Sequence, residues 1–285
     1  MEGFQSEVRD FVRECTGREP LVLGVAGADA PGLCLTADGR LAVVTVPLEF
    51  FRRGGAVGEL IALEEEPVVR QAGDRVFLYE DRWRNDGAAV RSMLRTRMGL
   101  GFRVFARNCE VLDLSPETAA DFLRRNHIYG SARARYRLGL FRRRATGMAE
   151  AGMDQTPVLA AVATFSSGIR KEDGTVSYEW VRYASVRGVR VTGGMGRLLD
   201  AFVTRVRGNG PVDVMTYADL EWYDGRSYRR LGFEPCGDRA PVWFMCRVGS
   251  GERRVCHGSG EQTAPGEVRI CNPGSRKYIL PVRDY

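Results

Sequence analysis

The sequence predicts a mixed α/β protein in which helices flank a mixed β-sheet. Three observations predict it. Short β-branched and aromatic runs alternate with amphipathic segments along the chain. Glycines stand where a strand pattern gives way to a helix pattern, most clearly at Gly193-Gly194. The composition of the 285 residues is globular, with 44% hydrophobic and 27% charged residues.

The first part of the chain alternates between short strand patterns and helix patterns. In the first segment, Phe4, Val8, Phe11 and Val12 recur at helical spacing, and the segment 37–40 (Ala-Asp-Gly-Arg) is typical of a hairpin turn. We expect a helix over 2–15, strands over 21–25, 32–36 and 41–46, a helix over 48–66 interrupted near residues 54–55, a strand over 75–80, a helix over 86–98 and a strand over 103–112.

The second part continues with longer elements. Ser115 is a favourable N-cap, and Pro116 fits the first position of the helix that follows it. We expect a helix over 116–125, strands over 136–142, 158–166, 177–186, 212–218 and 241–248, a helix over 222–231, a loop or hairpin over 249–266, and a last pair of strands over 268–271 and 277–282.

Charge is distributed unevenly. The net charge is +6, but residues 1–105 hold 14 arginines against 16 acidic residues, whereas the remainder holds 28 basic against 20 acidic residues. The stretch 124–144 contains eight arginines and no acid. Such a stretch is either a solvated face or a surface that follows phosphates.

Cysteine spacing and hydropathy indicate where in the cell the protein is expected. The seven cysteines have no paired spacing, which favours reduced thiols and a cytoplasmic protein. No apolar run is long enough for a membrane span, and the amino terminus has no signal-peptide core, so we expect no membrane partner. His257 beside Cys256 lacks the spacing of a zinc site, and we expect no metal.

The most informative stretch runs from Val189 through two glycines into an amphipathic segment. A strand, a glycine turn and a helix start bring backbone amides and the positive helix end to one point, which is a phosphate-binding arrangement. Two registers stay open, G-x-G-x-x-L from Gly194 and R-x-x-G-x-M from Arg190, and an ordinary structural turn is the alternative. The expected binding residues are Arg190, Gly193, Gly194, Met195, Gly196 and Arg197.

After this turn come an apolar strand ending at Asp219 and the segment Tyr228-Arg-Arg-Leu-Gly-Phe233. In that order, the three pieces resemble the acetyl-coenzyme A core of the GNAT acyltransferases. The resemblance implies a GNAT-like sheet and acetyl-CoA, or another acyl-CoA, as donor. It implies Glu179 as the base, Asp219 as a further candidate, and Tyr228 as the acid that protonates the thiolate. Simple alternatives are an exposed strand position for Glu179 and sheet packing for Tyr228.

A narrower resemblance covers residues 76–285. The runs Val76–Trp83 (VFLYEDRW), Phe122–Ser131 (FLRRNHIYGS) and Tyr178–Tyr183 (YEWVRY) are similar to phage and mobile-element chains. In those chains a VSR-like, homing-endonuclease-associated nuclease domain precedes a GNAT-like domain. The second half is also distantly similar to the phage Mom DNA-modification protein. These resemblances imply a DNA-related function, with modules over 1–110, 111–248 and 249–285.

The first module departs from the nuclease pattern. A restriction-type nuclease holds Mg²⁺ with acidic residues and a lysine on adjacent strands, but the segments 32–36 and 41–46 contain neither. We therefore expect a degenerate restriction-nuclease-like module without nuclease activity, serving as a scaffold or a DNA-positioning domain.

His127 lies beside the arginine stretch. A histidine at a helix end is usually a cap or a surface residue, but a titratable imidazole in a basic region could also serve a nucleic-acid substrate. The expected nucleic-acid contacts, with DNA favoured, are Arg124, Arg125, Tyr129, Arg133, Arg135 and Arg137.

The leading hypothesis is an N-acyltransferase whose acceptor is a nucleobase amine, with His127 as a further candidate catalytic residue. Two alternatives stay open. One is a non-catalytic DNA-binding protein that keeps both folds, and the other is a generic small-molecule or protein N-acetyltransferase.

Overall fold

The computed structural model describes residues 3–24, 29–142, 158–208, 210–247, 249, 252–256 and 263–282. The chain divides into two compact units, each assembled from segments that are distant in sequence. Unit 1 comprises Met1–Leu100, Tyr217–Ser227 and Cys236–Lys277, and unit 2 comprises Gly101–Thr216, Tyr228–Pro235 and Tyr278–Tyr285. The predicted contiguous modules, with boundaries at residues 110 and 248, remain a prediction.

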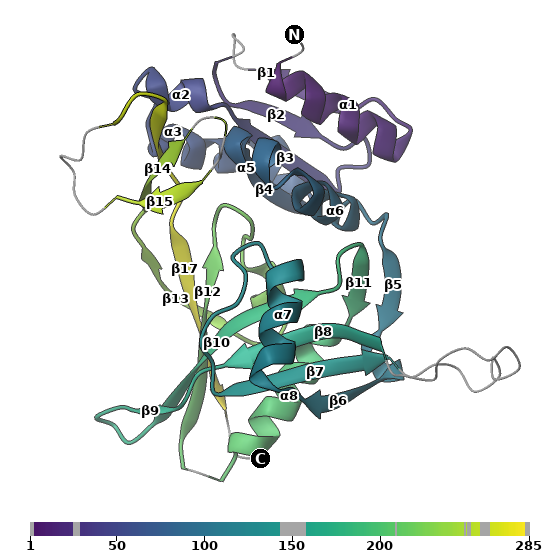
Figure 1. Ribbon diagram of the computed structural model, residues 1–285, viewed down its shortest axis with the longest axis vertical. Coiled ribbons are helices and arrows are strands. Elements are labelled where there is room, and N and C mark those ends of the chain that lie inside the picture. Colours follow the sequence, from purple (N-terminus) through teal and green to yellow (C-terminus); the bar gives the residue numbers. More distant parts are fainter. Residues whose placement is uncertain are drawn as a thin grey trace, which may run out of the picture. The chain divides into compact units, whose positions relative to one another are not determined.

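Unit 1 is built on a four-stranded sheet of order β1-β2-β3-β4, in which only β3 and β4 are parallel (Figure 1). A second sheet has the order β15-β14-β16. The elements are α1 (Phe4–Thr16), β1 (Leu21–Gly24), β2 (Gly32–Leu35), β3 (Leu41–Val46), α2 (Leu48–Arg52), α3 (Val57–Ala62), η1 (Leu63–Glu65), α4 (Pro67–Gln71), β4 (Asp74–Tyr79), α5 (Glu80–Asn85), α6 (Gly87–Arg97), β14 (Trp243–Arg247), β15 (Arg253–Val255) and β16 (Glu267–Cys271).

The core of unit 1 joins the two sheets. All six residues of β3 are buried because both faces of the strand are covered, which explains its unbroken apolar run. Val44 and Phe77 of the first sheet belong to the same apolar cluster as Val268 and Ile270 of β16. Residues more than 180 positions apart in the chain therefore stabilise one core.

Unit 2 contains most of a larger mixed sheet of order β13-β17-β12-β10-β8-β7-β6, with β9 paired to β10. Strands β12, β13 and β17 contribute residues to both units. The elements are β5 (Phe102–Phe105), η2 (Ala106–Asn108), β6 (Cys109–Asp113), α7 (Pro116–Asn126), β7 (Tyr136–Arg142), β8 (Val158–Phe165), β9 (Ile169–Arg170), β10 (Val176–Ser185), β11 (Val189–Thr192), α8 (Gly194–Val206), β12 (Val212–Asp219), α9 (Arg226–Arg229), β13 (Glu234–Arg239) and β17 (Ser275–Val282).

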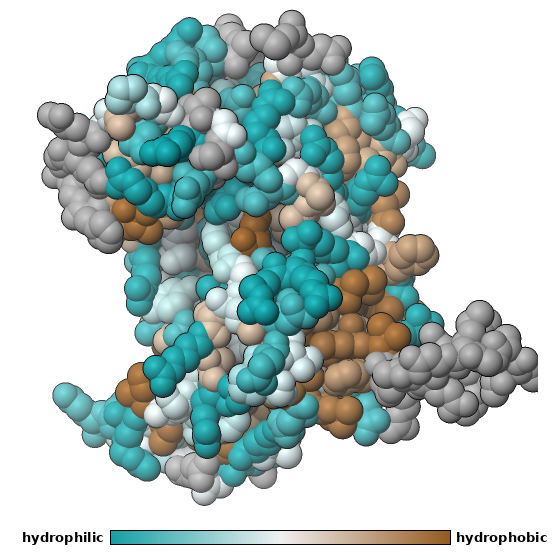
Figure 2. Space-filling view, viewed as in Figure 1, coloured by the Kyte–Doolittle hydropathy of each residue, from teal (hydrophilic) through white to brown (hydrophobic). Residues whose placement is uncertain are grey.

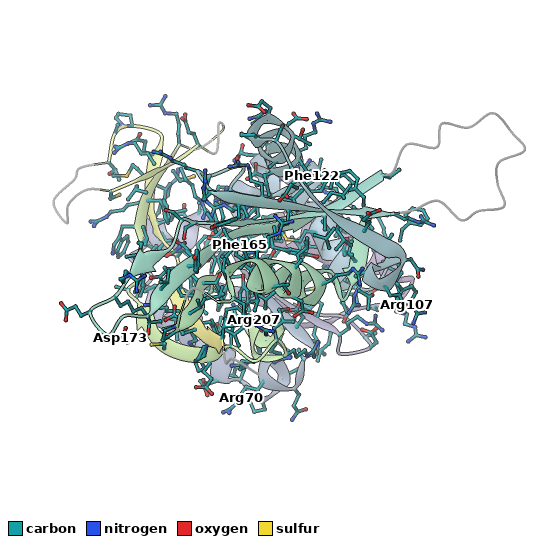
Figure 3. All side chains as sticks on the ribbon, turned by 90° about the horizontal axis from the view of Figure 1, so that it is seen from below. Arg70, Arg107, Phe122, Phe165, Asp173 and Arg207 are labelled. Carbon is teal, nitrogen blue, oxygen red and sulfur yellow. The ribbon has the colours of Figure 1, made fainter. Side chains whose placement is uncertain are left out.

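Helices α7 and α8 cover opposite faces of the unit 2 sheet. Phe165 of β8 stacks on Phe202 of α8 with ring centroids 3.8 Å apart. On the other face, Phe122 of α7 packs against Val162 and Ala184. Figure 3 shows Phe122 and Phe165 on the two sides of the sheet. We call these sides the α8 face and the α7 face.

The α7 face carries apolar side chains beyond the area that α7 covers. Phe141, Leu159 and Val186 are only partly buried against the α7 cluster. Figure 2 shows an apolar patch on this part of unit 2, in the region of β7 and β8. The helix itself begins as predicted, since Thr118 donates its backbone N–H to the Ser115 side chain.

Two predicted elements were wrong. The strand expected over 103–112 is two strands, because the turn Ala106–Asn108 breaks it and sends β5 to pair with β11 and β6 to pair with β7. The helix expected over 222–231 shrinks to Arg226–Arg229, since Gly225 adopts a positive φ of 79° just before it.

The last two strands do not pair with each other. β16 pairs with β14, whereas β17 lies between β12 and β13 in the large sheet. The segment 249–266, expected to be a loop or a hairpin, contains strand β15, which pairs with β14. β15 (Arg-Arg-Val) is short and polar, and it pairs with the apolar strand β14.

Candidate functional site

The glycine turn joins β11 to α8 within unit 2. Gly193 is the N-cap and has a φ of 77°, a left-handed conformation that side chains disfavour. The cap gives no side-chain hydrogen bond to the helix. The first amides of α8, from Gly194 onward, therefore lack a capping side chain, and they lie at the positive end of the helix.

Close approach of neighbouring groups requires the next glycine. A Cβ on Gly194 would lie 2.8 Å from the Tyr183 hydroxyl oxygen and 2.8 Å from a Val191 methyl carbon, so no side chain fits there. Arg190 and Arg197 are exposed on either side of the turn. The turn thus combines free backbone donors with two flexible cations, which suits a diphosphate or phosphate group.

The start of α8 also reaches the segment that contains Tyr228. A Cβ on Gly196 would lie 3.3 Å from Cδ2 of Leu231, and the Leu231 N–H donates to the carbonyl of Tyr228 over 2.9 Å. The Tyr228 ring packs on Trp180 of β10, with centroids 6.0 Å apart. The glycine turn, the Tyr228 segment and β10 are therefore neighbours in one unit.

Strands β10 and β12 run in parallel only over their first residues. The paired positions end at Glu179 and Met215. One residue further, the Thr216 hydroxyl donates to the carbonyl of Trp180 over 3.1 Å. On its other side, β10 has a bulge between Trp180 and Arg182. A bulge beside the end of a ladder re-aims side chains, which is common at functional sites.

Glu179 is half-buried and lies on the α7 face. Its neighbours Tyr178 and Trp180 pack on the α8 face, against Phe202 and Phe165 respectively, and strand side chains alternate. The Glu179 N–H donates to the Ser166 hydroxyl over 2.8 Å. Glu179 and Tyr228 therefore approach β10 from opposite faces, and they do not contact each other directly.

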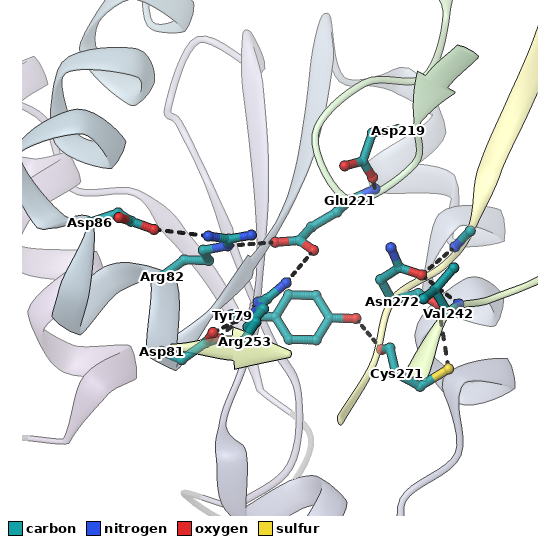
Figure 4. A network of polar contacts seen from close by, with 11 residues as sticks. Tyr79, Asp81, Arg82, Asp86, Asp219, Glu221, Val242, Arg253, Cys271 and Asn272 are labelled. Carbon is teal, nitrogen blue, oxygen red and sulfur yellow. Dashed lines mark hydrogen bonds and ion pairs between the residues drawn. The ribbon is translucent and has the colours of Figure 1, made fainter. Parts of the chain in front are cut away.

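Asp219 has a local structural role in unit 1. Its carboxylate accepts the N–H of Glu221 over 2.9 Å, and its carbonyl accepts the N–H groups of Trp222 and Tyr223 (Figure 4). The residue thus fixes the turn that follows β12. A role as a base remains a prediction, and the turn supplies a structural reason for an aspartate here.

His127 is the C-cap of α7. Its Nδ1 accepts the Tyr129 N–H over 3.1 Å, which leaves the proton of the neutral ring on Nε2. Burial, and to a lesser degree the positive charge of Arg182, lowers the pKa of His127 to about 4. The imidazole is therefore neutral at physiological pH.

The expected nucleic-acid residues differ in their surroundings. Arg124 and Arg125 are exposed and both form ion pairs with Asp121. Arg133, Arg135 and Tyr129 are exposed in the segment between α7 and β7. Arg137 is half-buried and donates Nη1 to the carbonyl of Ala134 over 2.6 Å. Residues 143 and 144, the last of the arginine stretch, lie outside the described residues.

No group of three or more His, Cys, Asp or Glu side chains in the described ranges is arranged to hold a metal ion. His257 lies outside those ranges. None of the helices in the described part of the chain has the length and apolar character that crossing a bilayer requires.

Four residues that lie near the candidate site were not among the predicted site residues: Trp180, Tyr183, Arg182 and Thr164. The alternation of Tyr178 and Trp180 signalled one buried face of β10, but the bulge after Trp180 reverses the face of the following side chains. A bulge has no reliable signature in a strand without glycine. The position of Arg182 therefore came only from the structure.

No family model and no curated protein matches this chain. Among solved structures, it is similar to a Bacillus subtilis acetyltransferase in complex with CoA (13% identity, TM-score 0.35, 61% of this chain and 99% of that chain). It is also similar to the ribosomal-protein-S18-alanine N-acetyltransferase of Escherichia coli (12%, 0.35, 62% and 96%). A third is a GNAT family acetyltransferase from Elizabethkingia anophelis with acetyl-CoA bound (9%, 0.32, 61% and 99%). At such identities and TM-scores, the likeness assigns neither an activity nor a ligand to this chain.

Proposed function

We propose that the protein is an acyl-CoA-dependent N-acyltransferase, with acetyl-CoA as the first donor to test. One observation carries the proposal: the uncapped start of α8 lies next to the Tyr228 segment and to the point where β10 and β12 part. The glycine turn is thus a neighbour of the Tyr228 segment and of β10, whose pairing with β12 ends at Glu179. Gly194 and Gly196 let the start of α8 pack closely on Tyr183, Val191 and Leu231, and the amides at that start are donors of the kind that hold a diphosphate.

The roles follow from chemistry at a thioester. Acyl-CoA supplies the activated acyl group, and the acceptor amine forms the new C–N bond as the C–S bond breaks. Amides of Gly194, Met195 and Gly196 would hold the diphosphate, with Arg190 and Arg197 adding charge. Glu179 would take the amine proton, and Tyr228 would return a proton to the thiolate sulfur. Asp219 and His127 are the reserve candidates for the base.

Titration calorimetry of acetyl-CoA into the full chain tests the cofactor. The Arg190→Gln/Arg197→Gln double variant should weaken binding by about tenfold or more, since each lost charge-assisted hydrogen bond contributes on the order of 1 kcal/mol. Arg207→Gln is the matched control: Arg207 is exposed at the other end of α8, roughly 20 Å away. Absence of acetyl-CoA binding in the wild type would refute the proposal.

We propose further that the acceptor is a nucleobase amine of DNA. Support comes from the exposed side chains Arg124, Arg125, Arg133 and Arg135 and from Tyr129, which is 41% exposed, a combination suited to phosphates and to base stacking. The resemblance of the sequence to mobile-element chains also favours DNA. Salt-dependent DNA binding, with log K falling linearly against log salt, is the expected signature.

The two rival functions give different outcomes. A non-catalytic DNA-binding protein would bind DNA with this salt dependence and show no affinity for acetyl-CoA. A generic small-molecule or protein N-acetyltransferase would bind and turn over acetyl-CoA, and DNA would neither bind nor compete. Gel-shift and calorimetric titrations on one preparation separate the three cases.

A further inference from the structure

Three polar side chains form a row across the unit 2 sheet. Arg137 of β7 pairs in register with Thr164 of β8, and Thr164 pairs with Arg182 of β10. Residues opposite each other on neighbouring strands stand on the same face, with Cβ atoms about 5 Å apart. We call Arg137, Thr164 and Arg182 the Arg–Thr–Arg row.

The row lies on the α7 face. Two residues along each strand, Val162 and Ala184 pack against α7, and a spacing of two keeps the face. The bulge after Trp180 is what brings Arg182 to this side. Glu179 occupies the same face, so the row and the proposed base share one side of β10.

The row holds donors that have no partner. Nε of Arg137, Oγ1 of Thr164 and Nε of Arg182 are buried and form no hydrogen bond with any described residue. Thr164 is only 1% exposed. An unsatisfied buried polar group costs on the order of 1–3 kcal/mol, and buried groups of this kind are usually hydrogen-bonded. Three of them in adjacent positions indicate a missing acceptor.

No carboxylate of the described residues neutralises the two guanidinium groups by an ion pair. Arg137 donates Nη1 to the carbonyl of Ala134, and Arg182 donates Nη1 to the carbonyl of Val181 over 2.9 Å. Hydrogen bonds from its own backbone N–H and from the Ser115 side chain lower the pKa of Glu117, and the charge of Arg137 adds a smaller effect; this fully exposed carboxylate forms no ion pair with Arg137. His127, which lies near Arg182, is neutral. The row therefore has two positive charges and no ion-paired carboxylate among the described residues, although Glu179 lies on the same face.

We propose that the Arg–Thr–Arg row binds an oxyanion, a phosphate or a carboxylate, that belongs to the acceptor substrate. Two guanidinium groups that flank a hydroxyl can surround such a group with donors from three sides. The acceptor assignment rests on the proposed function, because it is Glu179 on the same face that would take the proton of the acceptor amine. The binding of the oxyanion itself does not depend on acyl transfer.

The test uses inorganic phosphate and acetate at constant ionic strength. Titrations are performed on the full chain in the Arg190→Gln/Arg197→Gln background, so that the turn at α8 contributes as little as possible. We expect one of the two anions to bind and to raise the midpoint of thermal unfolding. Preference for phosphate indicates a nucleotide or nucleic-acid acceptor, and preference for acetate indicates a carboxylate acceptor.

Further substitutions locate the binding. Arg137→Gln/Arg182→Gln should lower the anion affinity by about tenfold or more, while Arg170→Gln, an exposed arginine of β9, should leave it unchanged. Thr164→Val replaces the hydroxyl with a methyl group and should weaken anion binding severalfold. If the double variant fails to fold, this single variant tests the site. Equal anion binding in all variants, or none in the parent, overturns the inference.

Failure of the two proposals can be told apart. Acetyl-CoA titrated into the Arg137→Gln/Arg182→Gln variant should bind as it does to the wild type, because these residues do not contact the turn at α8. Anion binding at the row without any acetyl-CoA binding would refute the acyltransferase and its acceptor assignment, and would leave the oxyanion site standing.

Discussion

Arg253 and Glu221 form a buried ion pair in unit 1, with Nη1 of the guanidinium 2.8 Å from a carboxylate oxygen. The same guanidinium donates Nε and Nη2 to the two carboxylate oxygens of Asp81 over 2.6 and 2.9 Å (Figure 4). It also lies over the Tyr79 ring, 4.9 Å from the centroid. One arginine thus ties β15 to the start of α5 and to the turn after β12.

The first prediction concerns this arginine. Arg253→Met should lower the free energy of unfolding by about 3–5 kcal/mol, because it leaves two buried carboxylates without their partner. Urea denaturation measures it. Arg254→Met, at the exposed neighbouring position, is the control and should change stability by less than about 1 kcal/mol. Equal effects of the two substitutions would contradict the importance of the pair.

The second prediction concerns pH and Glu221. Burial raises the pKa of Glu221 to about 7 from 4.5, and the charge of Arg253 offsets this only in part. The folded state therefore favours the protonated form, so its contribution to stability is complete below pH 4.5 and is lost as pH rises towards 7.

Glu221→Gln removes this titration. The difference in unfolding free energy between wild type and Glu221→Gln should change between pH 4.5 and 7, to the disadvantage of the wild type as pH rises, and then level off. Denaturation at a series of pH values measures it. A difference that is flat over this window would show that Glu221 keeps an ordinary pKa.

The third prediction concerns His127, whose contribution to stability is lost as pH falls, whereas that of Glu221 is lost as pH rises. Burial lowers the pKa of His127 to about 4 from 6.5, so the folded state favours the neutral ring. This contribution is present above pH 6.5 and is lost as pH falls towards 4. His127→Asn keeps an acceptor for the Tyr129 N–H and should remove the acid-side loss, as seen in a pH series of thermal unfolding. An unchanged series would argue for an exposed imidazole.

The fourth prediction concerns Gly193. Gly193→Ala should destabilise the protein by about 1 kcal/mol, because a Cβ disfavours the left-handed conformation that the N-cap adopts. Gly3→Ala is the matched control: Gly3 is also a helix N-cap, but it has an extended backbone and open space around its Cβ position. Chemical denaturation measures both, and equal losses would contradict the backbone argument.

The fifth prediction tests the proposed acid. If transfer occurs, Tyr228→Phe should lower kcat by about 10²-fold while acetyl-CoA affinity stays unchanged, because only the hydroxyl is lost. The ring packing on Trp180 and Phe233 is kept. Tyr217→Phe, on β12, serves as the control for loss of a tyrosine hydroxyl. A kcat equal to that of the wild type would leave Tyr228 as a packing residue.

Much of the local structure could be predicted from sequence. The strand over 41–46, the strand over 136–142 and the helix that begins after Ser115 have the predicted positions or lie within a residue of them. These elements carry their signals in adjacent residues, as side-chain alternation, β-branching or a capping side chain. The glycine turn before α8 is of the same kind, since Gly193 itself permits the left-handed backbone.

The roles of the candidate site residues stay predictions, but the structure shows where these residues lie. The residues of the turn and Tyr228 were named from the sequence, and the structure places their segments side by side through Gly196 and Leu231. The position of Glu179 on the other face of β10 was not foreseen. Nor was the role of Asp219 in its own turn, because a carboxylate at a strand end gives the same sequence signal whether it caps a turn or binds a ligand.

The sequence by itself determined the periodicity of side chains in strands and helices, the N-cap of α7 and the glycine turns. These features depend on interactions between residues a few positions apart. Tertiary structure decided which strands pair, where a bulge turns Arg182 to the α7 face, and which acids meet Arg253. Pairing of β5 with β11 joins residues more than 80 positions apart, and the Asp81–Arg253 contact joins residues 172 positions apart. Which segments become partners depends on which buried surfaces fit together in space. The local sequence pattern of either segment does not show this.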